Sequence, residues 1–269
     1  MVPDGETLYV ATTIQPARAR IERFQNDWTP PVLQPRRGAV ARLAARMGYG
    51  HPVAVFVAAM LASLALISTV SIVLGLLVTR VILHIGGVAG WDEHVNTWLA
   101  AHRTPFRTHL SLIGSIMSGG VVLPIIAGLT AFASAVMRKW RLAAFLVFVL
   151  AVESASYRIT TLVIHRHRPR VVRLEDLPVN ASYPSGHTAA SIAVYCGLAL
   201  LLTSLVGNLA FRTAAWCAAV LIVAFDVFSR LYRGMHHPLD VAGGVVVGIA
   251  AVCLLVLTCR ASGAAADST

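Results

Sequence analysis

Charged residues are scarce in this sequence. Only 13% of the 269 residues are Asp, Glu, Lys or Arg, whereas 57% are hydrophobic, and the mean hydropathy is +0.72. A domain that folds in water carries more charge than this on its surface, so the composition excludes an ordinary soluble globular protein. It indicates an integral membrane protein, and the length leaves room for one membrane bundle and no second folded domain.

Two further absences narrow the class. The first fifty residues contain no early apolar core of the kind that a secretory signal has, so we expect the first apolar run to remain as a membrane helix. The cysteines have neither metal-ligand nor redox-motif spacing, which predicts buried free thiols and no metal site. They are Cys196, Cys217, Cys253 and Cys259.

Six apolar runs are each long enough to cross a bilayer, which takes about 20 residues. They lie at 52–79, 110–137, 142–164, 187–206, 212–231 and 239–259. We therefore predict an all-α polytopic membrane protein with six transmembrane helices. A mobile basic tail is expected over 1–50, the membrane domain over 51–262, and a short C-terminal tail over 263–269.

The net charge of +10 is spread over tail and loops, which does not favour nucleic acid binding. It is more informative about orientation, because basic residues flank membrane helices on the cytoplasmic side. Such residues concentrate before residue 50 and in the second-to-third connection: Arg18, Arg20, Arg23, Arg36, Arg37, Arg42, Arg46, Arg138, Lys139 and Arg141. With six spans, both termini are then cytoplasmic, and the loops at 80–109, 165–186 and 232–238 are extracytoplasmic. The plasma (inner) membrane is the expected location.

The first extracytoplasmic loop has a helical pattern of its own. Trp91, Val95, Trp98 and Leu99 recur at helical spacing among polar residues. This pattern predicts a short helix in the outer interface with its tryptophans at headgroup depth. An interfacial anchor is favoured over a rim helix beside a binding site.

Two clusters of polar residues lie at the ends of apolar runs. Arg166, His167, Arg168 and Pro169 close the third run, and guanidinium groups match phosphate oxygens, although a basic collar at a helix end gives the same pattern. The segment from Pro184 to His187 opens the fourth run. A helix N-terminus with Ser185 and Gly186 can hold an anion beside His187, although a simple N-cap also explains Ser185.

A third cluster joins the fifth and sixth runs, with Ser229, Arg230, His236 and Asp240. Asp240 falls in the first turn of the last helix, where a carboxylate could reach back to a ring nitrogen of His236 and fix its tautomer. An alternative of equal weight is that Asp240 only stabilises the helix N-terminus electrostatically. Because helices three to six alternate in direction, all three clusters emerge on one face, an arrangement that suits phosphoryl transfer through a histidine nucleophile.

These residues resemble the type 2 phosphatidic acid phosphatase superfamily, the membrane relatives of bacterial acid phosphatases and vanadium haloperoxidases. The family pattern is Lys, six residues, Arg-Pro; then Pro-Ser-Gly-His; then Ser-Arg, five residues, His, three residues, Asp. Arg168-Pro169, Pro184 to His187, and Ser229-Arg230 with His236 and Asp240 match it in order over roughly residues 52–259. The resemblance implies a phosphatase bundle of the haloperoxidase-like kind.

The resemblance also implies a role for each matching residue. His236 is the nucleophile that forms a phosphohistidine, Asp240 orients it, and His187 protonates the leaving oxygen and later activates water. The residues that bind the phosphate are Arg168, Arg230, Ser185 and Gly186, with Arg166 beside them. The reaction requires no metal or other cofactor.

One position departs from the family pattern, because Thr161 stands where the lysine is expected. Arg158 lies one helical turn earlier, about 4.5 Å of rise away, and we hypothesise that it supplies the missing charge. Two acids inside predicted spans also need partners, since an ionisable group at mid-membrane costs about 2.5 to 3.5 kcal/mol on insertion scales. We expect Asp226 to pair with Arg230, and Glu153 with Arg158; trapped water or hydroxyl groups are the alternative.

The sequence as a whole predicts a membrane phosphatase acting on a lipid phosphate or pyrophosphate. Phosphatidic acid, phosphatidylglycerol phosphate and polyprenyl pyrophosphate all fit, and membrane lipids are the expected partners. Two other functions remain open: a lipid phosphotransferase, and a non-catalytic binder or transporter of lipid phosphates.

Overall fold

The protein is almost entirely helical in the computed structural model, which describes residues 29–35 and 51–266. Six helical segments are long and apolar enough to cross a membrane, which confirms the predicted spans. They are α3 (Pro52–Arg80) with the short η2 (Ile82–His84); α5 (Pro105–Met117) with α6 (Val122–Val136); α7 (Trp140–Val163); α8 (Gly186–Ser191) through the π-helical turn η3 (Ile192–Cys196) to α9 (Gly197–Leu205); α10 (Leu209–Tyr232); and α11 (Pro238–Ala266). Between the first two spans lies α4 (Val88–Ala101).

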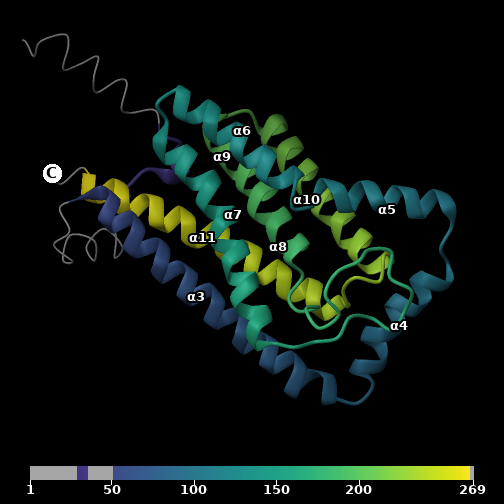
Figure 1. The fold of residues 1–269 in the computed structure, drawn as a ribbon. Coiled ribbons are helices and arrows are strands. Elements are labelled where there is room, and N and C mark those ends of the chain that lie inside the picture. Colours follow the sequence, from purple (N-terminus) through teal and green to yellow (C-terminus); the bar gives the residue numbers. More distant parts are fainter. Residues whose placement is uncertain (1–28, 36–50, 267–269) are drawn as a thin grey trace, which may run out of the picture.

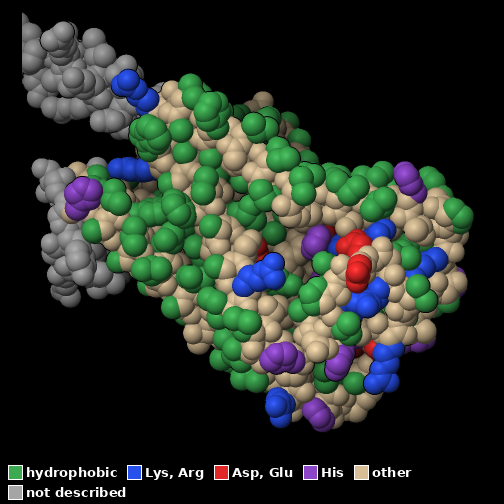
Figure 2. Space-filling view, viewed as in Figure 1, with side chains coloured by type: hydrophobic (Ala, Val, Ile, Leu, Met, Phe, Trp, Pro, Cys, Tyr) green, Lys and Arg blue, Asp and Glu red, His purple; other side chains and the backbone are tan. Residues whose placement is uncertain are grey.

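The two ends of the bundle differ in chemistry. In Figure 1 the start of α3 and the end of α11 lie together at one end, whereas α4 and the loops before α8 and α11 lie at the other. Figure 2 shows hydrophobic side chains over the body of the bundle and arginine, acidic and histidine side chains gathered at the α4 end. An apolar body with one polar end is what a membrane protein with an interfacial site requires.

The second span is not one helix. It is interrupted after Met117 and resumes at Val122, and its two halves pack on different neighbours: α5 against α10, and α6 against α7. The half that packs on α10 carries Ser111 and Ser115, whose contacts reach the polar end described below. The break after Met117 thus allows the two halves of this span to pack against different helices.

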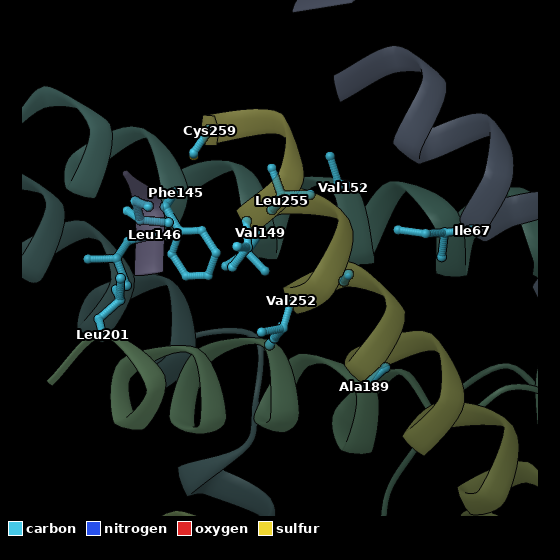
Figure 3. Packing of buried hydrophobic residues seen from close by; sticks show 14 of the residues in the cluster. Ile67, Phe145, Leu146, Val149, Val152, Ala189, Leu201, Val252, Leu255 and Cys259 are labelled. Atoms are coloured by element: carbon cyan, nitrogen blue, oxygen red, sulfur yellow. The ribbon is translucent and has the colours of Figure 1, made fainter. Parts of the chain in front are cut away.

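The core lies between α7 and α11. Phe145, Val149 and Val152 follow one face of α7, and Val252, Leu255 and Cys259 meet them from α11, all of them less than 9% exposed. Figure 3 shows these side chains interleaved between the two helices, with Ile67 of α3 at the edge. Because lipid tails are as apolar as the side chains, this close packing rather than water exclusion holds the helices together.

Glycines in α11 let this helix approach the segment that precedes α8. A methyl group on Gly244 would lie 2.5 Å from the carbonyl oxygen of Ser185, and one on Gly243 would lie 2.5 Å from the Tyr183 ring. Only a residue without a side chain fits such contacts. The two glycines therefore bring the second and third sequence clusters into contact, a feature that the sequence analysis did not use.

Three boundary predictions need correction or lie outside the described residues. Residues 29–35 are docked rather than mobile: Leu33 is fully buried in the core, and Nε of Arg260 donates to the Val32 carbonyl oxygen at 2.8 Å. The rest of the predicted tail over 1–50 lies outside the described part. The last helix continues to Ala266 instead of ending at 262.

The cysteines are free, as predicted, but not all are buried. Cys259 is buried, Cys196 is half-buried, and Cys217 and Cys253 are exposed on α10 and α11. In a membrane-spanning helix an outward position faces lipid tails, in which a thiol behaves as a small hydrophobic group.

Candidate active site

The three clusters meet at the polar end of the bundle. The connection between α7 and α8 carries Arg166, Arg168 and the residues before Ser185; the turn between α10 and α11 carries His236. These segments are tied by backbone hydrogen bonds, from Ser182 N to the Arg166 oxygen at 3.0 Å and from Ser185 N to the Asp240 oxygen at 2.9 Å. The sequence prediction that one face holds all three clusters is thus supported by direct contacts.

The ring of His236 is held in one tautomer by its surroundings. Nδ1 lies 2.7 Å from the carbonyl oxygen of Ser182, and a carbonyl can only accept, so Nδ1 carries the proton. Nε2 is then unprotonated, and it lies 3.5 Å from a terminal nitrogen of Arg168. The nitrogen with the free lone pair therefore faces the arginine that would hold a phosphate.

The environment of His236 favours the neutral ring. The side chain is 2% exposed. Burial, and after it the positive charge of Arg168, lowers the pKa of His236 well below its ordinary value, although the charge of Asp240 opposes this. A neutral imidazole is the form that can act as a nucleophile.

Asp240 does not contact His236, which corrects the direct orienting contact predicted from the sequence. Its carboxylate accepts from the Ser182 hydroxyl at 2.5 Å, the His237 backbone N at 2.8 Å, and a terminal nitrogen of Arg166. Its nearest ring is that of His237, with Nδ1 at 3.2 Å. Asp240 therefore orients His236 only through Ser182, whose hydroxyl binds the carboxylate while its carbonyl accepts from the ring.

Arg166, predicted to lie beside the phosphate-binding residues, is engaged by two acids. Its guanidinium group bridges two buried carboxylates, those of Asp240 and of Asp92 on α4. A phosphate could bind its terminal nitrogens only by displacing one of these buried carboxylates. Arg166 thus ties the last helix to α4.

The polar face of α4 points into the protein, while Trp91 and Trp98 are more than half exposed. Asp92 accepts from the backbone N of Leu239 at 3.0 Å and so caps the start of α11. Asn96 donates to the carbonyl oxygens of Leu231 and His236, at 3.0 and 2.9 Å. The favoured interpretation as an anchor was therefore incomplete, because α4 also braces the turn that carries His236.

Arg230 is fully buried and lies between two carboxylates. Its Nε is 3.7 Å from Asp226 Oδ1, which confirms the predicted pairing. Its terminal nitrogens donate to the two oxygens of Glu175, at 3.0 and 2.9 Å. Sequence reasoning missed Glu175, because nothing in the loop pattern between α7 and α8 distinguishes it from its neighbour Asp176.

The second cluster opens α8 as predicted. The Ser185 hydroxyl accepts from Thr188 N at 3.5 Å and so caps the helix, and the Tyr157 ring lies over Gly186, where a methyl group would be 3.0 Å from it. His187, half-buried, is near enough to His236 to contribute to lowering its pKa, after burial and the nearby arginines. The two histidines and the helix N-terminus thus border one polar region.

The position of the missing lysine, Thr161, lies in the last turn of α7. The half-buried Thr161 donates its hydroxyl to the Arg158 carbonyl oxygen at 2.9 Å. The Arg158 guanidinium lies 5.9 Å from the centre of the Tyr157 ring, the same ring that covers Gly186. Its predicted pair with Glu153 does not form: residues five apart on a helix diverge by about 140°, and Glu153 is buried with Ser154 as its partner.

This arrangement defines a polytopic membrane protein with a polar site of two histidines and several arginines at one end. The family model of the PAP2 superfamily matches residues 142–263, the part that contains all three clusters. This part of the chain is therefore similar to the PAP2 superfamily, the family that the motifs resemble.

Two known proteins are similar to this chain, one over a short segment and the other over most of its length. An undecaprenyl-diphosphatase of Sulfolobus acidocaldarius is 37% identical over 75 residues, which are 28% of this chain and 32% of that protein. The match thus spans about a third of the length of that curated relative. The crystal structure of a transmembrane PAP2-type phosphatidylglycerolphosphate phosphatase from Bacillus subtilis aligns with a TM-score of 0.57 and 22% identity, over 76% of this chain and 93% of that one. It confirms the fold.

Proposed function

We propose that this protein is a membrane-bound lipid phosphatase that hydrolyses a lipid phosphate or pyrophosphate through a phosphohistidine on His236. The observation that carries the proposal is the bond from Nδ1 of His236 to the Ser182 carbonyl oxygen, which leaves Nε2 free beside Arg168. The match to the PAP2 family model and the activities of the two similar proteins support the same reaction class.

The proposed reaction has two steps. Nε2 of His236 attacks phosphorus, a nitrogen–phosphorus bond forms, the bond to the leaving oxygen breaks, and His187 gives that oxygen a proton. His187 then takes a proton from water, whose oxygen bonds to phosphorus while the nitrogen–phosphorus bond breaks, so that inorganic phosphate leaves and the neutral His236 ring is restored. Arg168 and Arg230 balance the charge on the non-bridging oxygens, which is the main contribution a protein makes to phosphoryl transfer.

The site is proposed to face the extracytoplasmic side of the plasma membrane. Arg138, Lys139 and Arg141 lie at the connection between α6 and α7, at the other end of the bundle, and seven further arginines precede α3 in the sequence. Such basic residues mark the cytoplasmic side. A lipid substrate would then reach the site from the outer leaflet with its headgroup at the level of α4.

Phosphate release by the purified protein tests the function. The substrates are phosphatidic acid, phosphatidylglycerol phosphate and a polyprenyl pyrophosphate in detergent, each with and without an alcohol acceptor. Release without an acceptor is expected from at least one of them, and in sealed vesicles only from substrate on the extracytoplasmic side. Transfer solely to the alcohol would instead identify a phosphotransferase, and binding without release from any substrate would identify a binder or transporter.

Arg158→Ala should weaken substrate binding if Arg158 replaces the family's lysine. A hydrogen bond to a charged group contributes about 1.5–3 kcal/mol, so KM for the lipid phosphate should rise by roughly one to two orders of magnitude. The measurement is steady-state phosphate release by the variant and the wild type.

A second substitution separates this role from a general effect of charge. Arg158→Ala with Thr161→Lys restores a cation at the family's position and should recover most of the lost affinity. Arg212→Ala, an exposed arginine at the opposite end of α10, is the matched control and should behave as the wild type. Unchanged KM in Arg158→Ala would show that the site works without a replacement for the lysine.

A further inference from the structure

The Glu175 carboxylate is surrounded by donors that suit a phosphate. Besides the two bonds from Arg230, it accepts from Nε of Arg233 at 2.5 Å and from the Ser115 hydroxyl at 2.6 Å. Glu175 itself is 20% exposed, whereas Arg230, Arg233 and Ser115 are each at most 7% exposed. The groups that donate to Glu175 are thus buried, whereas the Glu175 side chain is partly exposed at the surface.

We propose that Arg230, Arg233 and Ser115 form an anion-binding subsite for a phosphate or pyrophosphate group of the lipid headgroup, and that Glu175 occupies it until the substrate displaces the carboxylate. The kind of anion and the phosphate-binding role of Arg230 rest on the proposed function; the exchange of an anion with Glu175 at Arg233 and Ser115 does not. Two guanidinium groups and a hydroxyl presented to one oxygen-bearing anion are the donors that a phosphate group takes in proteins.

The charges of the cluster favour this exchange. Three guanidinium groups, of Arg168, Arg230 and Arg233, stand against two carboxylates, of Glu175 and Asp226. Arg168 donates to the carbonyl oxygens of Pro178, Met235 and Ala181, and no carboxylate among the described residues forms an ion pair with it. When Glu175 leaves, the cluster has an excess of two positive charges, which a phosphate dianion neutralises.

The contacts of Glu175 permit the carboxylate to move without unfolding the loop. The loop is anchored beside it through Leu174, whose backbone N donates to the Arg233 oxygen at 3.1 Å and whose oxygen accepts from Arg233 at 2.8 Å. The carboxylate is ionised throughout the physiological range: burial opposes ionisation, but Arg230, with Ser115 and Arg233, lowers the pKa of Glu175 to about 2. Rotation of one partly exposed side chain therefore frees the donors.

Space for a headgroup lies next to the cluster. A cavity of about 530 Å³ opens beside Arg233 and Leu174, and its other walls include Arg103, His109 and Leu112 of the segment that begins α5. A lining that combines basic and apolar side chains suits the junction between a charged headgroup and lipid chains. A group bound between Arg230 and Arg233 would have its remainder in this cavity.

Binding of inorganic phosphate to the full-length protein in detergent tests the subsite without requiring turnover. Glu175→Gln and Glu175→Ala remove the competing charge, so inorganic phosphate should bind about ten-fold more tightly, because a site that is mostly occupied binds a ligand with reduced apparent affinity. Asp176→Asn, the same change at the neighbouring exposed acid, should bind phosphate as the wild type does.

A double variant assigns the gain to the cluster. In Glu175→Ala with Arg233→Met the tighter binding should disappear. The proposal is overturned if neither Glu175 variant binds phosphate more tightly than Asp176→Asn, or if the gain persists without Arg233. Glu175→Gln retains the hydrogen-bonding shape, so it keeps the test valid if the alanine variant fails to fold. Should no lipid yield phosphate, the proposed function fails, while these binding measurements still decide on the subsite.

Discussion

His236→Ala is expected to abolish phosphate release, lowering kcat by about three orders of magnitude or more, as the loss of a nucleophile does in other enzymes that form covalent intermediates. Nε2 of this ring is the free nitrogen beside Arg168, and alanine leaves no group to receive the phosphoryl. Rapid acid-free quenching with a radiolabelled lipid phosphate should also trap labelled wild-type protein and no labelled variant.

The neighbouring histidine provides the matched control. Both ring nitrogens of His237 face carboxylates, Nδ1 at 3.2 Å from Asp240 and Nε2 at 3.2 Å from Glu93, so it cannot attack phosphorus. His237→Ala should retain the labelled intermediate and lose less than about ten-fold in kcat, the scale of a lost neutral hydrogen bond. Full activity in His236→Ala, or loss of the intermediate only in His237→Ala, would refute the assignment.

The spans and the meeting of the three clusters were predictable because they depend on properties that lie along the chain. Hydropathy over about 20 residues gives a membrane helix, and an alternating direction of successive spans brings their ends to a common side. The motif spacing then identified His187, His236 and Arg230. None of these steps needs knowledge of which side chains touch.

The partners of Asp240 and Arg166 could not be predicted in this way. Asp240 lies four residues after His236, a spacing that suggests a direct contact, but α11 begins between them, at Pro238. The carboxylate is thereby directed to Ser182, His237 and Arg166. Such contacts depend on how segments distant in sequence are packed, which spacing alone does not encode.

The contacts of the polar face of α4 with the rest of the protein could have been predicted from the sequence, but only the anchoring role of its tryptophans was. Asp92, Glu93 and Asn96 share one side of the helix, opposite to Trp91 and Trp98. At a membrane interface the tryptophans face the headgroups, so the acidic side can only face solvent or protein. The arginines Arg166 and Arg168 in the loop between α7 and α8 would have indicated protein, because a buried carboxylate is tolerated only when it is paired with a cation.

Arg166→Met should destabilise the fold by about 3–5 kcal/mol, the cost of removing one partner from a buried ion pair. Methionine fills much of the volume but leaves the carboxylates of Asp92 and Asp240, 1% and 0% exposed, without their cation. Because Asp240 holds Ser182 and Ser182 holds the His236 ring, kcat should fall as well. Thermal unfolding in detergent and phosphate release measure the two effects.

The same variant distinguishes the two roles considered for Arg166. A phosphate ligand would raise KM and leave the unfolding temperature near that of the wild type, whereas a structural bridge should lower the unfolding temperature together with kcat. Arg170→Met is the control, since Arg170 is exposed in the same loop and its contact with Glu93 is made by the backbone N. Adding Asp92→Asn to Arg166→Met removes one of the uncompensated charges and should recover part of the stability, because the cost resides in the buried carboxylates rather than in a lost contact with substrate.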